Sequence, residues 1–127
     1  MSYRMTIVAG LVTMEAELNN SPTARMIWDA LPIAGQVNTW GDEIYFTIPV
    51  HAEQADDARA DVEVGELGYW AVGEALCIFF GPTPFSTSDK PRAASPVNIV
   101  GRVLGDATQF RRVPAGATVM LGKDESA

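Results

Sequence analysis

The chain has 127 residues, of which nine are basic and sixteen acidic, and its formal net charge is -7 at pH 7. This length suits one domain with one substantial core, and the negative charge disfavours nucleic acid and anionic membrane surfaces as partners. The composition, 47% hydrophobic with eleven glycines and eight prolines, is typical of a globular protein rich in turns. We therefore expect a single domain over residues 1–127, with an ordered core at about 5–121.

The first predicted elements are a hairpin and a helix. Apolar and polar residues alternate in Leu11–Leu18, as in a half-buried strand, and Gly10 supplies a turn from a preceding strand at Met5–Val8. Ser21 is placed to cap a helix that ends at Pro32. The apolar face of that helix consists of Ala24, Ile27, Trp28 and Leu31.

The rest of the chain is predicted to form short strands separated by turns and one long loop. The strands are expected at 43–49, 61–64, 67–70, 75–80, 97–104 and 117–121. The run at 75–80 is apolar at every position, which indicates a central strand covered on both faces. Four prolines in residues 82–96 predict a long surface loop, and Asp106 is placed to cap a helical turn that reaches Arg112. Seven or eight short strands favour a closed barrel or a sandwich.

The single cysteine, Cys77, lies inside the apolar run and predicts a buried thiol without a disulfide. Residues 1–12 lack the long apolar core and the small-residue cleavage site of a signal peptide. No apolar stretch approaches the ~20 residues that a membrane helix needs. We therefore expect a cytoplasmic protein with no membrane partner, and no motif indicates a cofactor.

Several sequence strings resemble those of a known protein family. Met14–Leu18 followed by Pro22–Ala24 is similar to the cyclophilin strand that leads into a helix started by proline and threonine. Further along, Phe79-Phe80, Pro82–Phe85 and the valine-rich strand Val97–Val103 follow one another as in that family.

Two longer strings, Trp40–Phe46 and Tyr69–Pro84, resemble more closely a family of small, largely uncharacterised prokaryotic cyclophilin-like proteins. The resemblance is colinear over roughly residues 5–121, which is nearly all of the chain. It implies a mainly β fold, a closed eight-stranded cyclophilin-like β-barrel with one or two short helices at its ends.

The cyclophilin resemblance also raises the question of peptidyl-prolyl isomerase activity. That activity depends on an arginine that polarises the prolyl amide, an apolar pocket and a histidine on its rim. Phe46 stands where the arginine would be, and Val97 or Pro96 stands where the histidine would be. The apolar part is better retained, because Phe80 falls near the pocket phenylalanine and Phe85 near a neighbouring aromatic. The resemblance therefore implies the fold without the standard catalytic residues, and no catalytic residue is assigned.

Other groups of reactive residues have ordinary explanations. His51 is the only histidine, and its place after Pro49 on a strand end favours a surface residue over a metal ligand or a catalytic base. The carboxylates at 56, 57, 61 and 63 lack the spacing of a calcium loop, and the glycines form neither a dinucleotide fingerprint nor a P-loop. We expect no metal site.

Three hypotheses about function follow. In the first, the chain is a binding module that holds a small molecule or an extended peptide in an aromatic groove with a polar rim. The residues expected to bind this ligand are Tyr45, Phe46, Phe80, Thr83 and Phe85.

In the second hypothesis the protein is a weak or divergent prolyl isomerase, or an enzyme for another reaction in the same groove. An isomerase would then use another donor, for which the candidates are Arg25, Arg92 and Arg102. In the third, exposed strand edges or aromatic patches pair subunits into a homo-oligomer.

Overall fold

The computed structural model describes residues 3–124, which form a ten-stranded sheet, one α-helix and one 3-10 helix. Eight strands have four or more residues: β1 (Tyr3–Ala9), β2 (Val12–Leu18), β3 (Ile33–Gln36), β5 (Glu43–Thr47), β7 (Glu66–Trp70), β8 (Ala75–Phe79), β9 (Arg92–Val103) and β10 (Thr118–Lys123). The two shorter strands are β4 (Asn38–Thr39) and β6 (Arg59–Asp61), and the helices are α1 (Pro22–Ala30) and η1 (Ala107–Arg112). Among the described residues, neither helix has the length and hydropathy needed to cross a membrane.

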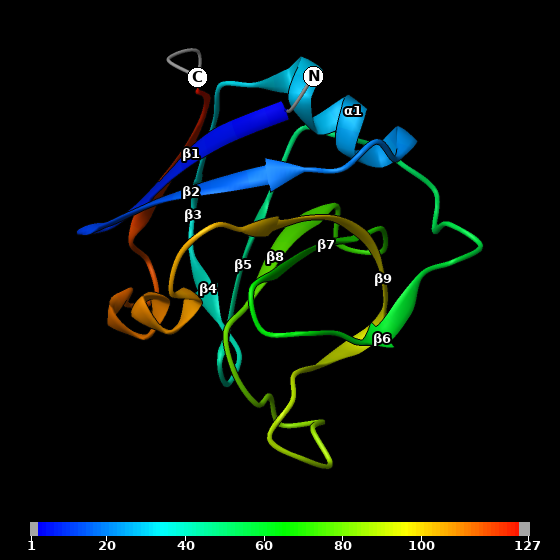
Figure 1. The fold of residues 1–127 in the computed structure, drawn as a ribbon, viewed down its shortest axis with the longest axis vertical. Coiled ribbons are helices and arrows are strands. Elements are labelled where there is room, and N and C mark those ends of the chain that lie inside the picture. The colour runs from blue at the N-terminus through cyan, green and yellow to red at the C-terminus, as the bar shows by residue number, and fades with distance from the viewer. Residues whose placement is uncertain (1–2, 125–127) are drawn as a thin grey trace.

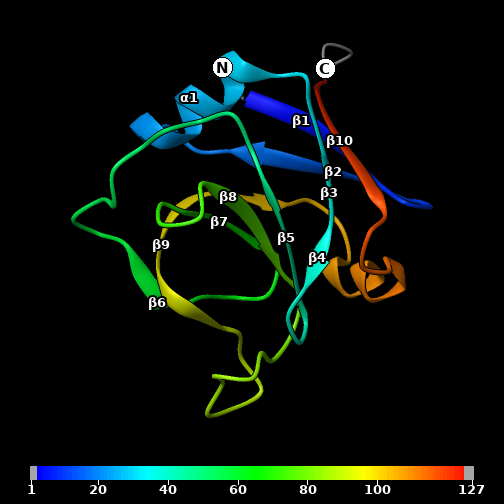
Figure 2. The same cartoon turned by 180° about the vertical axis from the view of Figure 1, so that it is seen from behind.

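The sheet curls round on itself (Figure 1). Its strands follow the order β3-β10-β1-β2-β9-β7-β8-β5-β4, with antiparallel pairing throughout, and β6 pairs with β9 outside this path. The two end strands, β3 and β4, are consecutive in the chain with only Val37 between them, and β3 packs against β5 (Figure 2). Within residues 3–124 no strand ladder joins β3 to β5, so chain continuity and side-chain packing bridge the seam. The predicted mainly β fold with eight principal strands is confirmed.

The N-terminal hairpin and helix form where the sequence places them. The even-numbered residues of Val12–Leu18 are buried and Thr13 and Glu15 are exposed, while Gly10 makes the turn with a φ of 56°. The Ser21 hydroxyl accepts a hydrogen bond from the Ala24 amide at 3.2 Å, which satisfies one of the free donors at the start of α1.

The long loop predicted at 82–96 is shorter than expected. From Arg92 onward its residues begin the twelve-residue strand β9, which pairs first with β6 and then with β7. The register with β6 shifts between Arg59 and Asp61, so β9 is bulged there and accommodates Pro96, which has no backbone donor. The strand predicted at 61–64 likewise lies earlier, at Arg59–Asp61.

Strand β8 separates two apolar clusters. Its five residues are all buried, as the apolar run predicts. On one side, alternate residues of β5, β7 and β8 join the main core inside the barrel. On the other side lies a smaller group beneath β9, which we call the outer cluster: Val62, Cys77, Phe79, Ala93 and Val97. The outer cluster therefore lies outside the barrel core, on the face of β8 opposite to the main core.

Candidate functional site

A small pocket lies against the outer cluster, between the strands β5, β8 and β7 and the first half of β9. Its volume is about 140 Å³. We call it the aromatic pocket, and it is lined by Trp40, Glu43, Tyr45, Trp70, Cys77, Ala93, Ala94, Ser95 and Val97. Three of these nine residues carry aromatic rings and one carries a carboxyl group, so the lining combines π faces with a single acidic side chain.

Strand register centres the aromatic pocket on Cys77. Tyr45 of β5 and Gly68 of β7 pair with Cys77 from either side. Glu43 pairs with the next residue on the same face of β8, Phe79, and is therefore a diagonal neighbour of Cys77.

Gly68 allows β9 to approach this face closely. A Cβ atom at Gly68 would lie only 2.6 Å from Cγ2 of Val97, a distance that real Cβ atoms do not tolerate. The absence of a side chain at this position therefore lets Val97 lie directly against β7. The β9 segment that precedes Val97, Ala93–Ser95, forms one wall of the pocket.

The turn that carries Trp40 and Glu43 is held on both sides. The Trp40 amide donates to the Glu43 carbonyl, and the Asp42 amide donates to the Pro82 carbonyl, both at 2.9 Å. The Arg111 guanidinium donates to the Asp42 carboxylate at 3.0 and 3.3 Å, which ties the turn to η1. These contacts fix the position of the Trp40 ring and of the Glu43 side chain.

The tryptophan rings are also anchored. The Trp70 indole donates a hydrogen bond to the Ser95 hydroxyl at 2.7 Å, and this bond joins β7 to the wall of the pocket that β9 forms. A Cβ atom at Gly73 would lie 2.5 Å from the Trp70 ring, so the ring rests on that backbone. Trp40 makes an edge-to-face contact with Phe85, with the ring centroids 5.1 Å apart. The aromatic pocket is thus preformed.

Among the acidic residues that the structure describes, Glu43 alone is buried, with 5% of its surface exposed. Burial raises the pKa of its carboxyl to about 7, and a hydrogen bond from the Cys77 thiol opposes that rise. Burial and the neighbouring Glu43 charge hold the pKa of Cys77 well above its ordinary value. Within residues 3–124 the Cys77 thiol is the one hydrogen-bond partner of this carboxyl, although a carboxylate can accept about four hydrogen bonds. Acceptor sites of Glu43 therefore remain for a ligand.

The residues predicted to bind a ligand do not all reach this pocket. Tyr45 lines it. Phe46, one position further along β5, points to the opposite face and is fully buried in the main core. Phe80 also belongs to the main core, where its ring lies 6.3 Å from that of Phe110. The protein's own side chains therefore fill the space around Phe46 and Phe80.

The other two predicted residues lie beside the aromatic pocket. Thr83 is buried, and its hydroxyl donates to the Arg92 carbonyl and contacts Ser86, so it shapes the loop. Phe85 is 54% exposed and supports Trp40 from outside the lining. Neither side chain lines the pocket: Thr83 is bonded to the first residue of β9, and Phe85 contacts the ring of Trp40.

Sequence reasoning missed Glu43, Trp40, Trp70 and the covering role of β9. A signal for Glu43 was present in the chain. The alternation that turns Ile44 and Phe46 inward places Glu43 and Tyr45 on the other face, and a neighbouring strand apolar on both faces indicates that this other face is covered as well. A carboxyl on a covered face is therefore a candidate site residue.

The remaining candidates lie elsewhere. His51 is an exposed residue that contacts the Glu74 carboxylate. The three arginines considered as donors are absent from the pocket lining: Arg25 is exposed on α1, Arg92 lies 4.0 Å from Asp61, and Arg102 borders another depression. Residues 3–124 contain no group of three or more His, Cys, Asp or Glu side chains arranged to hold a metal ion.

A wider hollow, of about 870 Å³, lies between the start of α1 and residues 51–57. Two buried polar side chains line it, Thr23 and Asn98, and they are bonded to each other. Asn98 accepts from the Ala55 amide at 2.7 Å and donates to the Thr23 hydroxyl and the Glu53 carbonyl at 3.1 and 2.9 Å. This amide therefore joins α1, β9 and the loop, and it leaves little capacity for a ligand.

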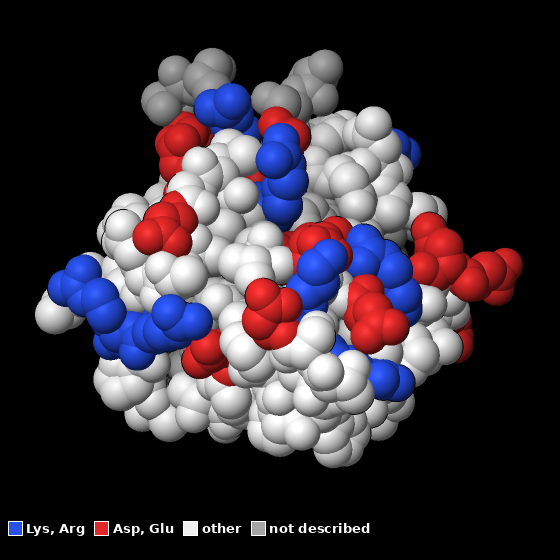
Figure 3. Space-filling model, turned by 60° about the horizontal axis from the view of Figure 1, so that its bottom comes forward, with Lys and Arg blue, Asp and Glu red and all other residues white. Residues whose placement is uncertain are grey.

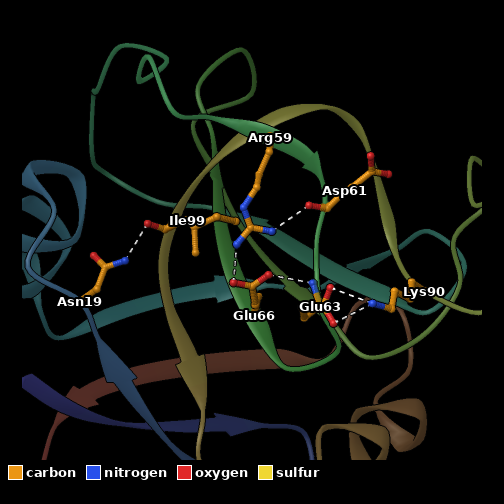
Figure 4. A network of polar contacts seen from close by, with 7 residues as sticks. All are labelled: Asn19, Arg59, Asp61, Glu63, Glu66, Lys90 and Ile99. Atoms are coloured by element: carbon orange, nitrogen blue, oxygen red, sulfur yellow. Dashed lines mark hydrogen bonds and ion pairs between the residues drawn. The ribbon is translucent and has the colours of Figure 1, made fainter.

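A network of paired charges covers β6 and the turn before β7 (Figure 4). Arg59 donates to the Asp61 carbonyl and to the Glu66 carboxylate, both at 2.8 Å, and Lys90 pairs with Glu63 at 3.3 Å. Side chains of both signs are intermixed on this face (Figure 3). Because the charges compensate one another, the network fastens β6 to its neighbours and does not form a surface of one sign.

The fold and the site together define a small β-barrel domain with a preformed pocket outside its main core. The sequence profile of the Cyclophilin-like family matches residues 3–122, and the chain belongs to that family. It is similar to the hypothetical protein AF2241 from Archaeoglobus fulgidus, with 39% identity and a TM-score of 0.81 to its solution structure. The match covers 97% of this chain and 95% of that one. No protein with a curated description matches the sequence.

Proposed function

We propose that this protein is a binding module whose aromatic pocket holds a small molecule or one side chain of an extended peptide. The observation that carries the proposal is Glu43, a buried carboxyl with open acceptor sites beside three aromatic rings. Burying a carboxyl without full pairing lowers the stability of a fold. Ionisable groups placed at such a cost are concentrated at functional sites.

The size of the aromatic pocket limits what enters it. Its volume of about 140 Å³ is close to that of an engineered cavity of ~150 Å³ that accepts benzene. A ligand group of roughly five to eight non-hydrogen atoms therefore fits, and the remainder of a larger ligand would lie outside, near Phe85 and the exposed Ala94. With a net charge of -7, the protein is not proposed to bind nucleic acid.

The contacts around the pocket favour binding without rearrangement. The hydrogen bond between Trp70 and Ser95, and the ion pair between Arg111 and Asp42, hold the walls in place before a ligand arrives. A preformed site avoids the entropy loss of ordering its side chains on binding.

Tryptophan signals provide a direct test. The chain has three tryptophans, and two of them, Trp40 and Trp70, line the pocket. The third, Trp28, packs against Tyr3 and Lys123 and is an internal reference. In an NMR screen with neutral, cationic and anionic fragments of up to eight heavy atoms, we expect binders to shift the indole signals of Trp40 and Trp70 and not that of Trp28.

Matched variants complete this test. Trp70→Ala should abolish the shifts of bound fragments, and Trp28→Ala should leave binding unchanged. A screen in which no fragment moves Trp40 or Trp70, in a protein whose spectrum shows it to be folded, would contradict the proposal.

The alternative function is a weak or divergent peptidyl-prolyl isomerase. Two observations favour it: membership of the cyclophilin-like family, and a pocket volume that would admit a proline ring. With no arginine in the lining, the donor to the prolyl amide would be protonated Glu43 or the Tyr45 hydroxyl. A protease-coupled isomerisation assay at pH 6, compared with Glu43→Gln, tests this version, and no acceleration at high protein concentration eliminates it.

A further inference from the structure

We propose that the aromatic pocket selects an organic cation, specifically an alkylammonium group with few N–H donors, such as a methylated amine. This inference rests on the proposed binding function and goes beyond it by naming the class of ligand. Three features carry it: the rings of the lining, the single acidic side chain among them, and the small number of other acceptors.

Aromatic residues form the side walls. Trp40, Tyr45 and Trp70 come from three different segments and converge on a space of about 140 Å³. The face of an aromatic ring carries negative charge and attracts a cation placed over it, most strongly for tryptophan and in a site shielded from water. Two tryptophans and a tyrosine around one small space therefore favour a positively charged group over a neutral group of equal size.

Within residues 3–124, no cationic side chain pairs with the Glu43 carboxyl. No Lys, Arg or His of the described chain lines the aromatic pocket. Asp42, which precedes Glu43 in the chain, is paired with Arg111 at 3.0 Å, and Arg92, which precedes the lining residue Ala93, lies 4.0 Å from Asp61. A bound cation would supply the opposite charge that the fold itself does not provide, and it would favour the ionised form of Glu43.

The number of acceptors restricts the kind of cation. A primary ammonium group has three donors that need partners when it is removed from water. Besides Glu43, the only side-chain oxygens of the lining are the hydroxyls of Tyr45 and Ser95, and Ser95 already accepts a hydrogen bond from Trp70. A methylated ammonium needs fewer acceptors, and its methyl groups can pack against the rings.

Ionisation of Glu43 makes this binding depend on pH. The titratable groups that face Glu43 are Tyr45 on its own strand and Cys77 on β8, while the lining residues of β7 and β9 carry no charge. With a Glu43 pKa of about 7, roughly a tenth of the carboxyl is ionised at pH 6 and nine tenths at pH 8. The affinity for a cation should therefore rise about tenfold between these pH values.

Choline and 3,3-dimethylbutan-1-ol form a matched pair of probes, because they share one shape and differ in charge. Isothermal titration of the full chain at pH 8 should give choline an affinity at least tenfold higher than the neutral alcohol. Glu43→Gln should remove most of this preference and its pH dependence, while the variant still binds the alcohol. Retained alcohol binding shows that the variant is folded and that its pocket is intact.

The source of the cation is decided by a third probe, a blocked tripeptide that contains trimethyllysine. Tighter binding of the tripeptide than of choline assigns the site to a peptide side chain, and the reverse order assigns it to a free small molecule. Equal binding of choline and the neutral alcohol would overturn the cation proposal and leave the pocket function standing. If no fragment reaches Trp40 or Trp70 either, the binding function itself fails.

Discussion

Replacing Glu43 with glutamine should change how the stability of the protein depends on pH. In the unfolded chain the carboxyl has an ordinary pKa near 4.5, and in the folded protein its pKa is about 7. Between these values the unfolded state has released the proton and the folded state still holds it. The free energy of unfolding must therefore fall as the pH rises from about 4.5 to 7, and the Glu43 contribution is constant outside that window.

The magnitude follows from the shift in pKa. Each unit corresponds to about 1.4 kcal/mol, so a shift from 4.5 to about 7 corresponds to about 3 kcal/mol. Glutamine keeps the shape of the side chain and has no charge to bury. We therefore expect the unfolding free energy of Glu43→Gln, relative to the wild type, to rise by about 3 kcal/mol between pH 4.5 and pH 8.

Urea unfolding at half-unit steps of pH measures this difference directly. Because other carboxylates titrate in both proteins, only the difference between variant and wild type isolates Glu43. Glu53→Gln is the matched control, since Glu53 is exposed and its variant should run parallel to the wild type. A Glu43→Gln difference that stays flat across this window, or that falls with pH, would refute the reasoning.

Two further substitutions and one labelling experiment probe the architecture of the aromatic pocket. Gly68→Ala should clash with Val97 and lower stability by about 1–3 kcal/mol in urea unfolding; unchanged stability would mean that β9 does not press on β7. Ser95→Ala removes the partner of the Trp70 indole and should cost about 1 kcal/mol, with faster hydrogen exchange at that indole, and unchanged exchange would contradict the bond. Cys77 is buried and its pKa is raised, so a thiol reagent too large for the pocket should label it far more slowly in the native protein than in the urea-unfolded protein, and equally fast labelling would contradict its burial.

Much of the fold could be predicted because its signals are local. The alternation in Val12–Leu18, the capping hydroxyl of Ser21 and the fully apolar strand at 75–79 each depend on neighbouring residues, and each appears in the structure. The start of β9 could not be found in this way. Prolines in residues 82–96 indicate a loop, and only pairing with the distant β6 makes residues 92–96 a strand.

The site was harder to predict because its parts are brought together by the fold. Ser95 and Trp70 are separated by 25 residues, and the Ser95 segment covers the pocket only because Gly68 lets β9 approach. The difference between Tyr45 and Phe46 shows how little separates a pocket residue from a core residue. Consecutive positions of one strand face opposite sides. An alignment that is shifted by one residue therefore exchanges the pocket face of the strand with its core face.

The two clusters on either side of β8 separate the residues that form the main core from those that line the pocket. The main core, which includes Phe46, Phe80 and Tyr69, holds the fold together without any residue of the aromatic pocket. Glu43 contributes to the pocket and, once ionised, weakens the fold. The same substitution, Glu43→Gln, is therefore expected to stabilise the protein above pH 7 and to remove its preference for a cation. Opposite effects on stability and binding are what distinguish a residue kept for a ligand from one kept for packing.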